Sequence, residues 1–321
     1  MALVLGDYRV ALDSSDKSAN VNFVSHAHTD HMAGLRKNRK ALASEITKDL
    51  VECRSDIKVE LAEEPDCVDL LDAGHILGSK QLYVENDLYG YSVVYSGDYQ
   101  MSRPLIAEKI EIREADVLVM DSTYPDPKVV FEDRGEVVTA IQHYAKMKLE
   151  KGIVLFGAHI IGRAQELIRI LNEVGIEPLV DERICKANAV YEKHGVRLSY
   201  RQADLFGSGL GKGENFVAIA EQPKLNQLRE KLASECPRRV FTAIATGLAR
   251  SFRFGTDVQF ALSDHADFSQ AVEYINACSP RIILTFGQRA DAFARNLSVK
   301  GYNARPLKST SELHSIMLNR I

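Results

Sequence analysis

Short apolar runs separated by polar turns fill the first third of the chain and predict a sheet of short strands. Such runs cover residues 2–5, 8–12, 21–25, 57–61 and 67–71. Residues 81–85 and 89–95 are two more runs joined by a short polar turn, which predicts a hairpin. The run at residues 115–120 predicts a further buried strand.

The pattern changes after Pro125 and Pro127, where longer amphipathic segments begin. The helix-like residues 135–151 precede a buried-strand run at 152–157, and residues 162–171 place their apolar side chains on one helical face. Strand-like and helix-like segments then alternate at residues 177–180, 216–220, 225–232 and 239–245. This alternation predicts a small parallel α/β unit.

In the last part of the chain, helix-like and strand-like segments alternate in the same way. Helices are predicted over residues 269–277 and 291–300, with a strand over 281–284 between them. The fold class predicted from these patterns is α/β.

A dense group of histidines follows the apolar run at residues 21–25. His26, His28, Asp30 and His31 occur where an extended segment turns toward a helix-like one. Imidazole and carboxylate side chains together suit Zn²⁺, with Mn²⁺ or Fe²⁺ as alternatives. Two pairs of ligands predict a dinuclear centre, and a polar loop with unrelated histidines is the alternative interpretation.

Other polar residues stand where predicted strands end. His75 lies between two glycines, Asp98 follows Ser96-Gly97, and Asp121 follows the run at residues 115–120. Carboxylates that repeatedly end strands, together with the histidine group, predict one site at the edge of a sheet.

Composition narrows the classes of protein. Of the 321 residues, 45% are hydrophobic and 26% charged, and the formal net charge is −4, so attraction to phosphates must be local. The five cysteines form no C-x-x-C pair, which is typical of a reducing compartment. Neither a signal peptide nor a membrane-spanning run is apparent, so we expect a cytoplasmic protein with no membrane partner.

The group His26-x-His28-x-Asp30-His31, His75 in its Gly-His loop and Asp98 in Ser-Gly-Asp resemble the metallo-β-lactamase fold in its zinc-hydrolase form. The stretches 162–166 (GRAQE) and 263–267 (SDHAD) resemble the β-CASP nucleases, which include 3′-end-processing enzymes and ligase-associated exonucleases. The resemblance implies an αββα sandwich over residues 1–128 and 256–321. A β-CASP cap, the small parallel α/β unit, would be inserted at residues 129–255.

The resemblance also implies roles for single residues. His26, His28 and His75 would hold one zinc, Asp30 and His31 a second, and Asp98 would bridge both. Asp13 would orient a ligand histidine. Asp30, Asp121 and His265 would be catalytic, with His265 as general acid toward the leaving oxygen and a metal-bound hydroxide as nucleophile.

One position departs from the family's pattern. The 3′-processing nucleases complete the second zinc site with a further histidine, and here that place falls on Phe286, which cannot ligate a metal. We therefore expect one complete zinc site beside an incomplete one, with Mn²⁺ as an alternative ion.

The predicted function is hydrolysis of nucleic acid, exonuclease-like, with DNA slightly favoured over RNA and a single-stranded or end-accessible substrate. The alternatives are an RNA 3′-end-processing ribonuclease, a catalytically weakened nucleic-acid-binding subunit, and an esterase acting on small substrates. A homodimer remains open. Phosphate contacts are assigned to five basic side chains, Arg163, Arg238, Arg239, Arg250 and Arg253.

Overall fold

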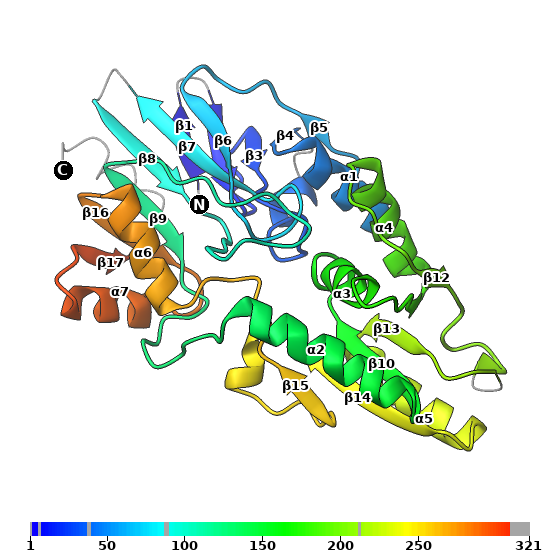
Figure 1. Cartoon of the computed structure of the whole chain (residues 1–321). Coiled ribbons are helices and arrows are strands. Elements are labelled where there is room, and N and C mark those ends of the chain that lie inside the picture. The colour runs from blue at the N-terminus through cyan, green and yellow to red at the C-terminus, as the bar shows by residue number, and fades with distance from the viewer. Residues whose placement is uncertain (1, 6–7, 37–39, 87–89, 211–212, 309–321) are drawn as a thin grey trace. The chain divides into compact units, whose positions relative to one another are not determined.

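The computed structural model describes residues 2–5, 8–36, 40–86, 90–210 and 213–308, which form two compact units (Figure 1). The first comprises Met1–Val130 and His265–Ile321, and the second comprises Phe131–Asp264. The second unit therefore ends later than the predicted residue 255. The reason is that β15 (Val258–Phe260) pairs in parallel with β14 (Arg239–Ala245) and completes the sheet of the second unit.

Two sheets form the first unit. One has the order β1 (Ala2–Leu5), β2 (Tyr8–Leu12), β3 (Val21–Phe23), β4 (Lys40–Leu42) and β5 (Glu60–Leu61). The other has the order β17 (Ala304–Pro306), β16 (Ile282–Phe286), β9 (Val117–Asp121), β8 (Tyr91–Tyr95), β7 (Lys80–Asn86) and β6 (Val68–Asp72). The predicted hairpin is confirmed, because β7 and β8 pair antiparallel; Tyr89 lies outside the described residues.

Side chains along each strand of the second sheet point alternately to its two faces, and a buried core lies on each face. In β9, Val117 and Val119 join a buried cluster shared with the first sheet, whereas Leu118 and Met120 join a cluster on the opposite face. Residues 117–120 are therefore all buried, which explains why this part of β9 is a continuous apolar run rather than an alternating one.

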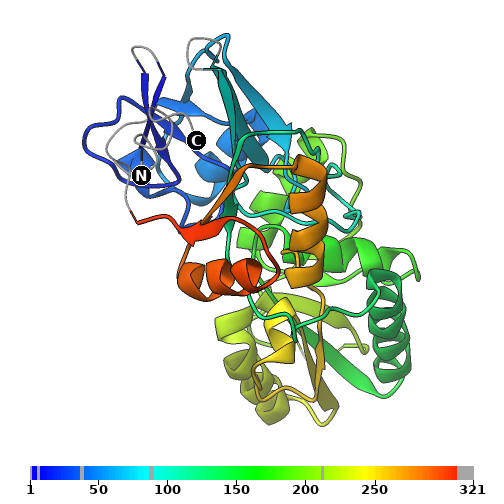
Figure 2. The same cartoon turned by 90° about the vertical axis from the view of Figure 1, so that its left-hand side faces the viewer.

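Helices α6 (Phe268–Cys278) and α7 (Ala290–Val299) cover that opposite face (Figure 2). Asp267 caps α6 because its side chain accepts from the Gln270 amide, and the Gln270 side chain accepts from the Asp267 amide. Helix α1 (Glu45–Arg54) begins at the cap Ser44 and buries Leu50 and Val51. A short 3₁₀ turn, η1 (Ala33–Arg36), lies between the histidine group and β4.

The second unit is a parallel sheet with helices on both faces. Its order is β12 (Arg201–Gln202), β11 (Leu179–Val180), β13 (Val217–Glu221), β10 (Gly152–Ala158), β14 and β15. One face packs against α2 (Arg134–Leu149), α3 (Arg163–Asn172) and α4 (Glu182–Lys193). The other packs against α5 (Leu225–Glu235), which follows the turn η3 (Gln222–Lys224).

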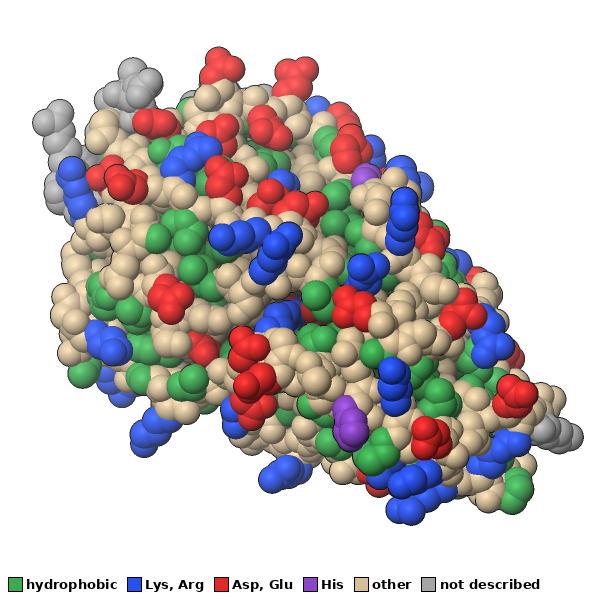
Figure 3. All heavy atoms as spheres, in the orientation of Figure 1, with side chains coloured by type: hydrophobic (Ala, Val, Ile, Leu, Met, Phe, Trp, Pro, Cys, Tyr) green, Lys and Arg blue, Asp and Glu red, His purple; other side chains and the backbone are tan. Residues whose placement is uncertain are grey.

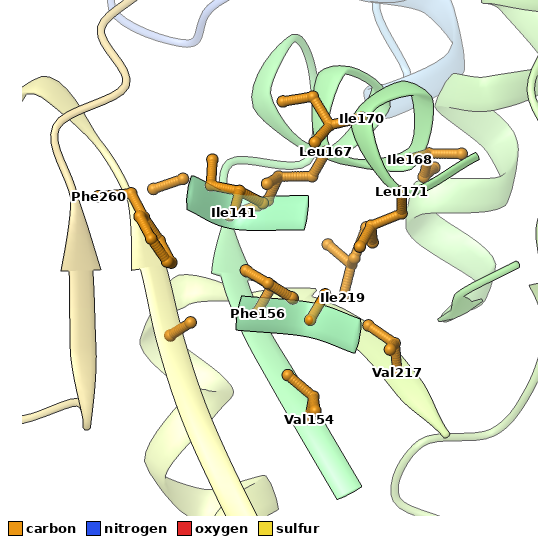
Figure 4. Close-up of a cluster of buried hydrophobic side chains, with 14 of the residues drawn as sticks. Ile141, Val154, Phe156, Leu167, Ile168, Ile170, Leu171, Val217, Ile219 and Phe260 are labelled. Carbon is orange, nitrogen blue, oxygen red and sulfur yellow. The ribbon is translucent and has the colours of Figure 1, made fainter. Parts of the chain in front are cut away.

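The largest core of this unit lies between β10, β13 and the helices α2 and α3 (Figure 4). Phe156 and Ile219 point from the sheet toward Leu167 and Leu171 of α3 in that view. Helix α4 was not predicted from the sequence, although Asp181 accepts from the Ile184 amide as an N-cap and the helix buries Ile184, Val190 and Tyr191.

The sheet topology brings several chain ends to one edge. Strands β8, β9 and β16 run parallel, so their carboxyl ends meet, and the register pairs Phe286 of β16 with Asp121 of β9. Strand β2 likewise runs parallel to β3, which brings Asp13 beside the segment that starts at Val24. Among the described residues, no helix is long and apolar enough to cross a membrane.

Candidate metal centre

The histidine group lies in the turn that follows β3. The strand ends at Phe23, two residues earlier than predicted, and the Val24 amide still bonds to Leu42 of β4. His26 is fully buried, whereas the Asp30 side chain is 82% exposed. The segment therefore runs from the core to the surface within a few residues, and its polar side chains project at different depths.

Four imidazole nitrogens surround one carboxylate oxygen of Asp98. The distances to Asp98 Oδ2 are 3.4 Å from His31 Nε2, 3.6 Å from His26 Nε2, 3.8 Å from His75 Nε2 and 3.9 Å from His265 Nε2. His28 Nδ1 lies 3.2 Å from His75 Nε2. The sequence-predicted residues His26, His28, His31, His75, Asp98 and His265 are thus brought together.

These separations fit a shared metal ion. Two atoms bound at about 2.1 Å to a tetrahedral Zn²⁺ lie about 3.4 Å apart. Ligand atoms of His26, His28, His75 and Asp98 all lie within 4.8 Å of one another. His26 Nε2 is buried and has no hydrogen-bond partner among the described residues, which is costly unless a ligand such as a metal occupies that position.

Ser25 sets the tautomer of His26. Its hydroxyl donates to Asp13 Oδ2 at 2.6 Å and contacts His26 Nδ1 at 3.0 Å. Because the hydroxyl proton is used on Asp13, the serine oxygen accepts from Nδ1–H. The lone pair of His26 then lies on Nε2, the nitrogen that faces Asp98.

Asp13 connects this network to His31. Its carboxylate accepts from the Ser25 amide at 2.8 Å, from the Tyr95 hydroxyl at 3.2 Å and from His31 Nδ1 at 2.9 Å. His31 Nε2 is thereby directed toward Asp98 and toward Asp30 Oδ2, 3.7 Å away. Asp13 has φ +42°, a strained value for a residue with a side chain, which this set of bonds offsets.

The electrostatics of the centre follow from burial and opposite charges. Burial lowers the pKa of His26 well below its usual value, and the neighbouring histidines lower it further. Burial alone would lower the pKa of His31, but the Asp13 and Asp98 carboxylates raise it to about 12. Burial opposes ionisation of Asp98, yet the surrounding imidazoles, led by His265, hold its pKa far below the usual range.

Glycines allow the loops to reach the centre. Gly97 has φ +53°, and a Cβ there would lie 2.6 Å from Ser25 Cβ. Gly74 has φ +73°, and a Cβ would lie 2.4 Å from the Gln100 carbonyl. Neither position accommodates another residue, so the backbone that presents His75 and Asp98 requires glycine there.

His265 and Asp121 form a second pair at the same edge. Asp121 Oδ2 lies 3.5 Å from His265 Nδ1, and the His265 side chain is 19% exposed. The backbone of His265 is held by Gln100, whose amide donates to its carbonyl at 2.9 Å. Ligand atoms of Asp98, Asp121 and His265 also lie within 4.8 Å of one another.

Phe286 occupies the strand end opposite Asp121 without offering a ligand atom. Its ring stacks on Tyr95, with ring centroids 4.8 Å apart and an interplanar angle of 26°. The Tyr95 hydroxyl donates to Asp13, so Phe286 packs against the group that supports His31.

The five arginines assigned to phosphate contact do not form one group. Arg163 is 3% exposed, and its guanidinium pairs with Glu166 and with Asp264. Arg238 and Arg239 lie at the start of β14, whereas Arg250 and Arg253 follow its end. Basic and acidic side chains are interspersed over the face shown in Figure 3.

Three supporting residues were not identified from the sequence. Ser25 and Tyr95 both bond to Asp13, and Gln100 bonds to His265. Ser25 directly precedes His26, and Gln100 follows Asp98 by two residues. Polar residues buried beside predicted ligands are therefore the signal that could have identified them.

No protein-family model matches this chain. A probable DNA ligase of Opitutus terrae is 31% identical over 91% of this chain and 29% of the ligase. An RNase J-like protein of Methanocaldococcus jannaschii is 29% identical over 49% of this chain and 44% of that protein. The mouse DNA cross-link repair 1A protein is 26% identical over 48% of this chain and 16% of that protein.

The chain thus spans less than half the length of each of these three relatives. Their names refer to nucleic-acid enzymes or DNA repair, and the similarity includes nearly the whole chain in the first case. With the histidine and aspartate cluster at the edge of the first unit, these similarities are consistent with the β-CASP branch of the metallo-β-lactamase fold that the sequence resembles.

Proposed function

We propose that this chain is a metal-dependent phosphodiesterase that hydrolyses nucleic acid. The observation that carries the proposal is the convergence of four imidazoles on Asp98 Oδ2 at 3.4–3.9 Å. In this interpretation the first unit is the metallo-β-lactamase domain and the second is the β-CASP cap.

His26, His28, His75 and Asp98 would hold one ion, with Zn²⁺ as the expected metal. His31 and Asp30 would offer ligands to a second ion, which would have fewer protein ligands because Phe286 offers none. A bound divalent ion would neutralise charge on the phosphate and acidify the attacking water.

His265 would supply the proton for the leaving group. Attack by water forms a new phosphorus–oxygen bond and breaks the bond to the leaving alkoxide. The alkoxide takes a proton from protonated His265 Nε2, and the proton that the water loses passes to solvent, from which His265 is protonated again. Asp121, 3.5 Å from Nδ1, would keep the ring oriented with Nε2 toward the centre. Proton donation of this kind contributes about 10²–10⁴-fold to the rate.

The relatives support nucleic acid as the substrate. Of the three described above, the one that matches over the largest part of this chain, 91%, is a probable DNA ligase, which favours DNA. The similarity to the RNase J-like protein makes RNA the second candidate substrate.

The test uses two substrates and one control. His265→Ala should slow hydrolysis of an oligonucleotide by about 10²–10⁴-fold. It should affect bis(p-nitrophenyl) phosphate far less, because p-nitrophenolate leaves without a proton. Exposed His143 in α2 provides the control, and His143→Ala should retain full activity. Asp98→Ala should lose both metal and activity. Full activity in purified His265→Ala or purified Asp98→Ala contradicts the proposal.

A further inference from the structure

The loop after β14 in the second unit has an unusual surface. It comprises the 3₁₀ turn η4 (Gly247–Arg250) and residues 251–255. Among the described residues, five large hydrophobic side chains are exposed, and Leu248 at 37% and Phe252 at 52% are both in this loop. Phe252 is the only aromatic residue of the five, so its ring is offered to solvent where apolar rings are normally buried.

The backbone beneath Phe252 is firmly held. The Gln259 side chain donates to the Phe252 carbonyl at 2.8 Å and accepts from the Phe254 amide at 2.8 Å. The Phe252 amide donates to the Leu248 carbonyl at 2.9 Å. The exposed ring therefore projects from an ordered loop, and a ligand that contacts it pays little for ordering the backbone.

Two arginines lie close to Phe252 in the chain. Arg253 is exposed and forms no ion pair with any described residue. Arg250 Nη2 lies 3.0 Å from Glu132 Oε1, but both side chains are largely exposed, so this surface pair is weak and can be exchanged. Asp257, the first acidic residue after this loop, is engaged elsewhere, since its Oδ2 accepts from the Thr242 amide and hydroxyl.

An exposed ring with cationic side chains nearby in the chain suits a base and its phosphates. Bases stack on aromatic side chains in single strands, and arginines contact the adjoining phosphates. The faces of bases in a duplex are covered by their neighbours, so a single strand fits this surface and a duplex does not. We propose that Phe252 is a stacking platform for one base of single-stranded nucleic acid, with Arg250 and Arg253 binding its phosphates. This inference rests on the proposed function.

The test measures binding by fluorescence anisotropy with the full metal-loaded chain. The probes are labelled phosphorothioate oligonucleotides, as single-stranded DNA, single-stranded RNA and duplex DNA of one sequence, because this backbone keeps its charge and slows hydrolysis. Phe252→Ala and Phe252→Leu should weaken single-strand binding by about 5- to 150-fold. Phe252→Trp should restore it, and Val299→Ala, which truncates another exposed apolar side chain, should have no effect.

Arg253→Ala should lower the slope of log affinity against log salt by about 0.7, as expected when one phosphate contact is lost. If the Phe252 variants lose the same affinity for single-stranded DNA and RNA, the platform accepts both. If they lose affinity for only one of the two, that nucleic acid is the one that Phe252 binds. Unchanged binding by Phe252→Leu, or duplex binding as tight as single-strand binding, overturns the proposal. Binding that depends on Phe252 without hydrolysis of unmodified DNA or RNA by the wild-type chain overturns the proposed function and leaves the platform standing.

Discussion

Asp13 shows how one side chain can determine the chemistry of its neighbours. It accepts hydrogen bonds from Ser25, Tyr95 and His31 while its backbone stays at φ +42°. By accepting from His31 Nδ1 and from the Ser25 hydroxyl, it leaves Nε2 of both His26 and His31 facing Asp98. Metal affinity in the proposed centre therefore depends on a residue that does not touch the metal.

Asp13→Asn is expected to weaken metal binding by about 10- to 100-fold, because an amide nitrogen cannot accept from His31 and Ser25 together. Competition with a chromogenic chelator measures the affinity. Asp16→Asn is the control, since Asp16 bonds to Ser18 and not to the histidine group. An Asp13→Asn chain with wild-type affinity would show that the network does not set the tautomers.

At the scale of elements, the ends of strands decide where the site forms. Gly97 follows β8 and lets the chain pass Ser25 closely. Gly97→Ala is expected to push Ser25 aside and reduce bound metal, in addition to about 1–2 kcal/mol of backbone strain. Metal content per chain after purification, measured by mass spectrometry, is the direct observation.

Gly175→Ala is the control that introduces backbone strain without a steric clash. Gly175 has a similar φ of +75°, but a Cβ there meets nothing within 4 Å. This variant should lose stability while keeping its metal. Equal metal content in the two variants would mean that the close approach of Gly97 to Ser25 is unimportant.

A buried ion-pair group joins α2 and α3 to the end of the second unit. Glu166 pairs with Arg134 and Arg163, Arg163 also pairs with Asp264 at 3.2 Å, and Arg134 donates to the Ser263 carbonyl at 2.6 Å. Glu166→Gln removes the negative charge that faces the buried Arg163 guanidinium and the partly buried Arg134 guanidinium, and it should cost about 3–5 kcal/mol. Urea unfolding followed by circular dichroism measures this, because the chain has no tryptophan.

The control for Glu166→Gln is a surface pair in the same unit. Arg183 lies 2.7 Å from Glu221 with its side chain 54% exposed, so Arg183→Ala should cost about 0–1 kcal/mol. A Glu166→Gln chain as stable as Arg183→Ala would argue against the buried group as a determinant of stability.

Periodicity predicted much of the element order, because most strands are apolar runs and most helices bury one face. It failed for α4, whose stretch is polar enough to resemble a loop, and for β15, a three-residue strand recognised only by its pairing with β14. Residue spacing predicted the histidine group. It did not predict the separation of Arg239 from Arg250, because β14 carries them to opposite ends of one sheet.

At the scale of the whole molecule, each unit has its own buried cores. Metal bound only in the folded first unit should stabilise that unit by about 2.7 kcal/mol at a free concentration 100 times the Kd. Hydrogen exchange should slow on adding Zn²⁺ at residues 24–31 and 73–79 and stay unchanged in the core of the second unit. The Asp98→Ala chain should show no change at either place, and slowing in both units alike contradicts this expectation.

The insertion of the second unit between β9 and α6 has a consequence for synthesis. All the candidate metal ligands precede the second unit in the chain, whereas His265 lies 165 residues after Gln100, to which it bonds. A growing chain therefore lacks both its proposed proton donor and β16, the strand beside β9, until the second unit has been made. Chains interrupted in the second unit would lack His265 and should not cleave nucleic acid efficiently, so synthesis of the second unit precedes assembly of the proposed catalytic site.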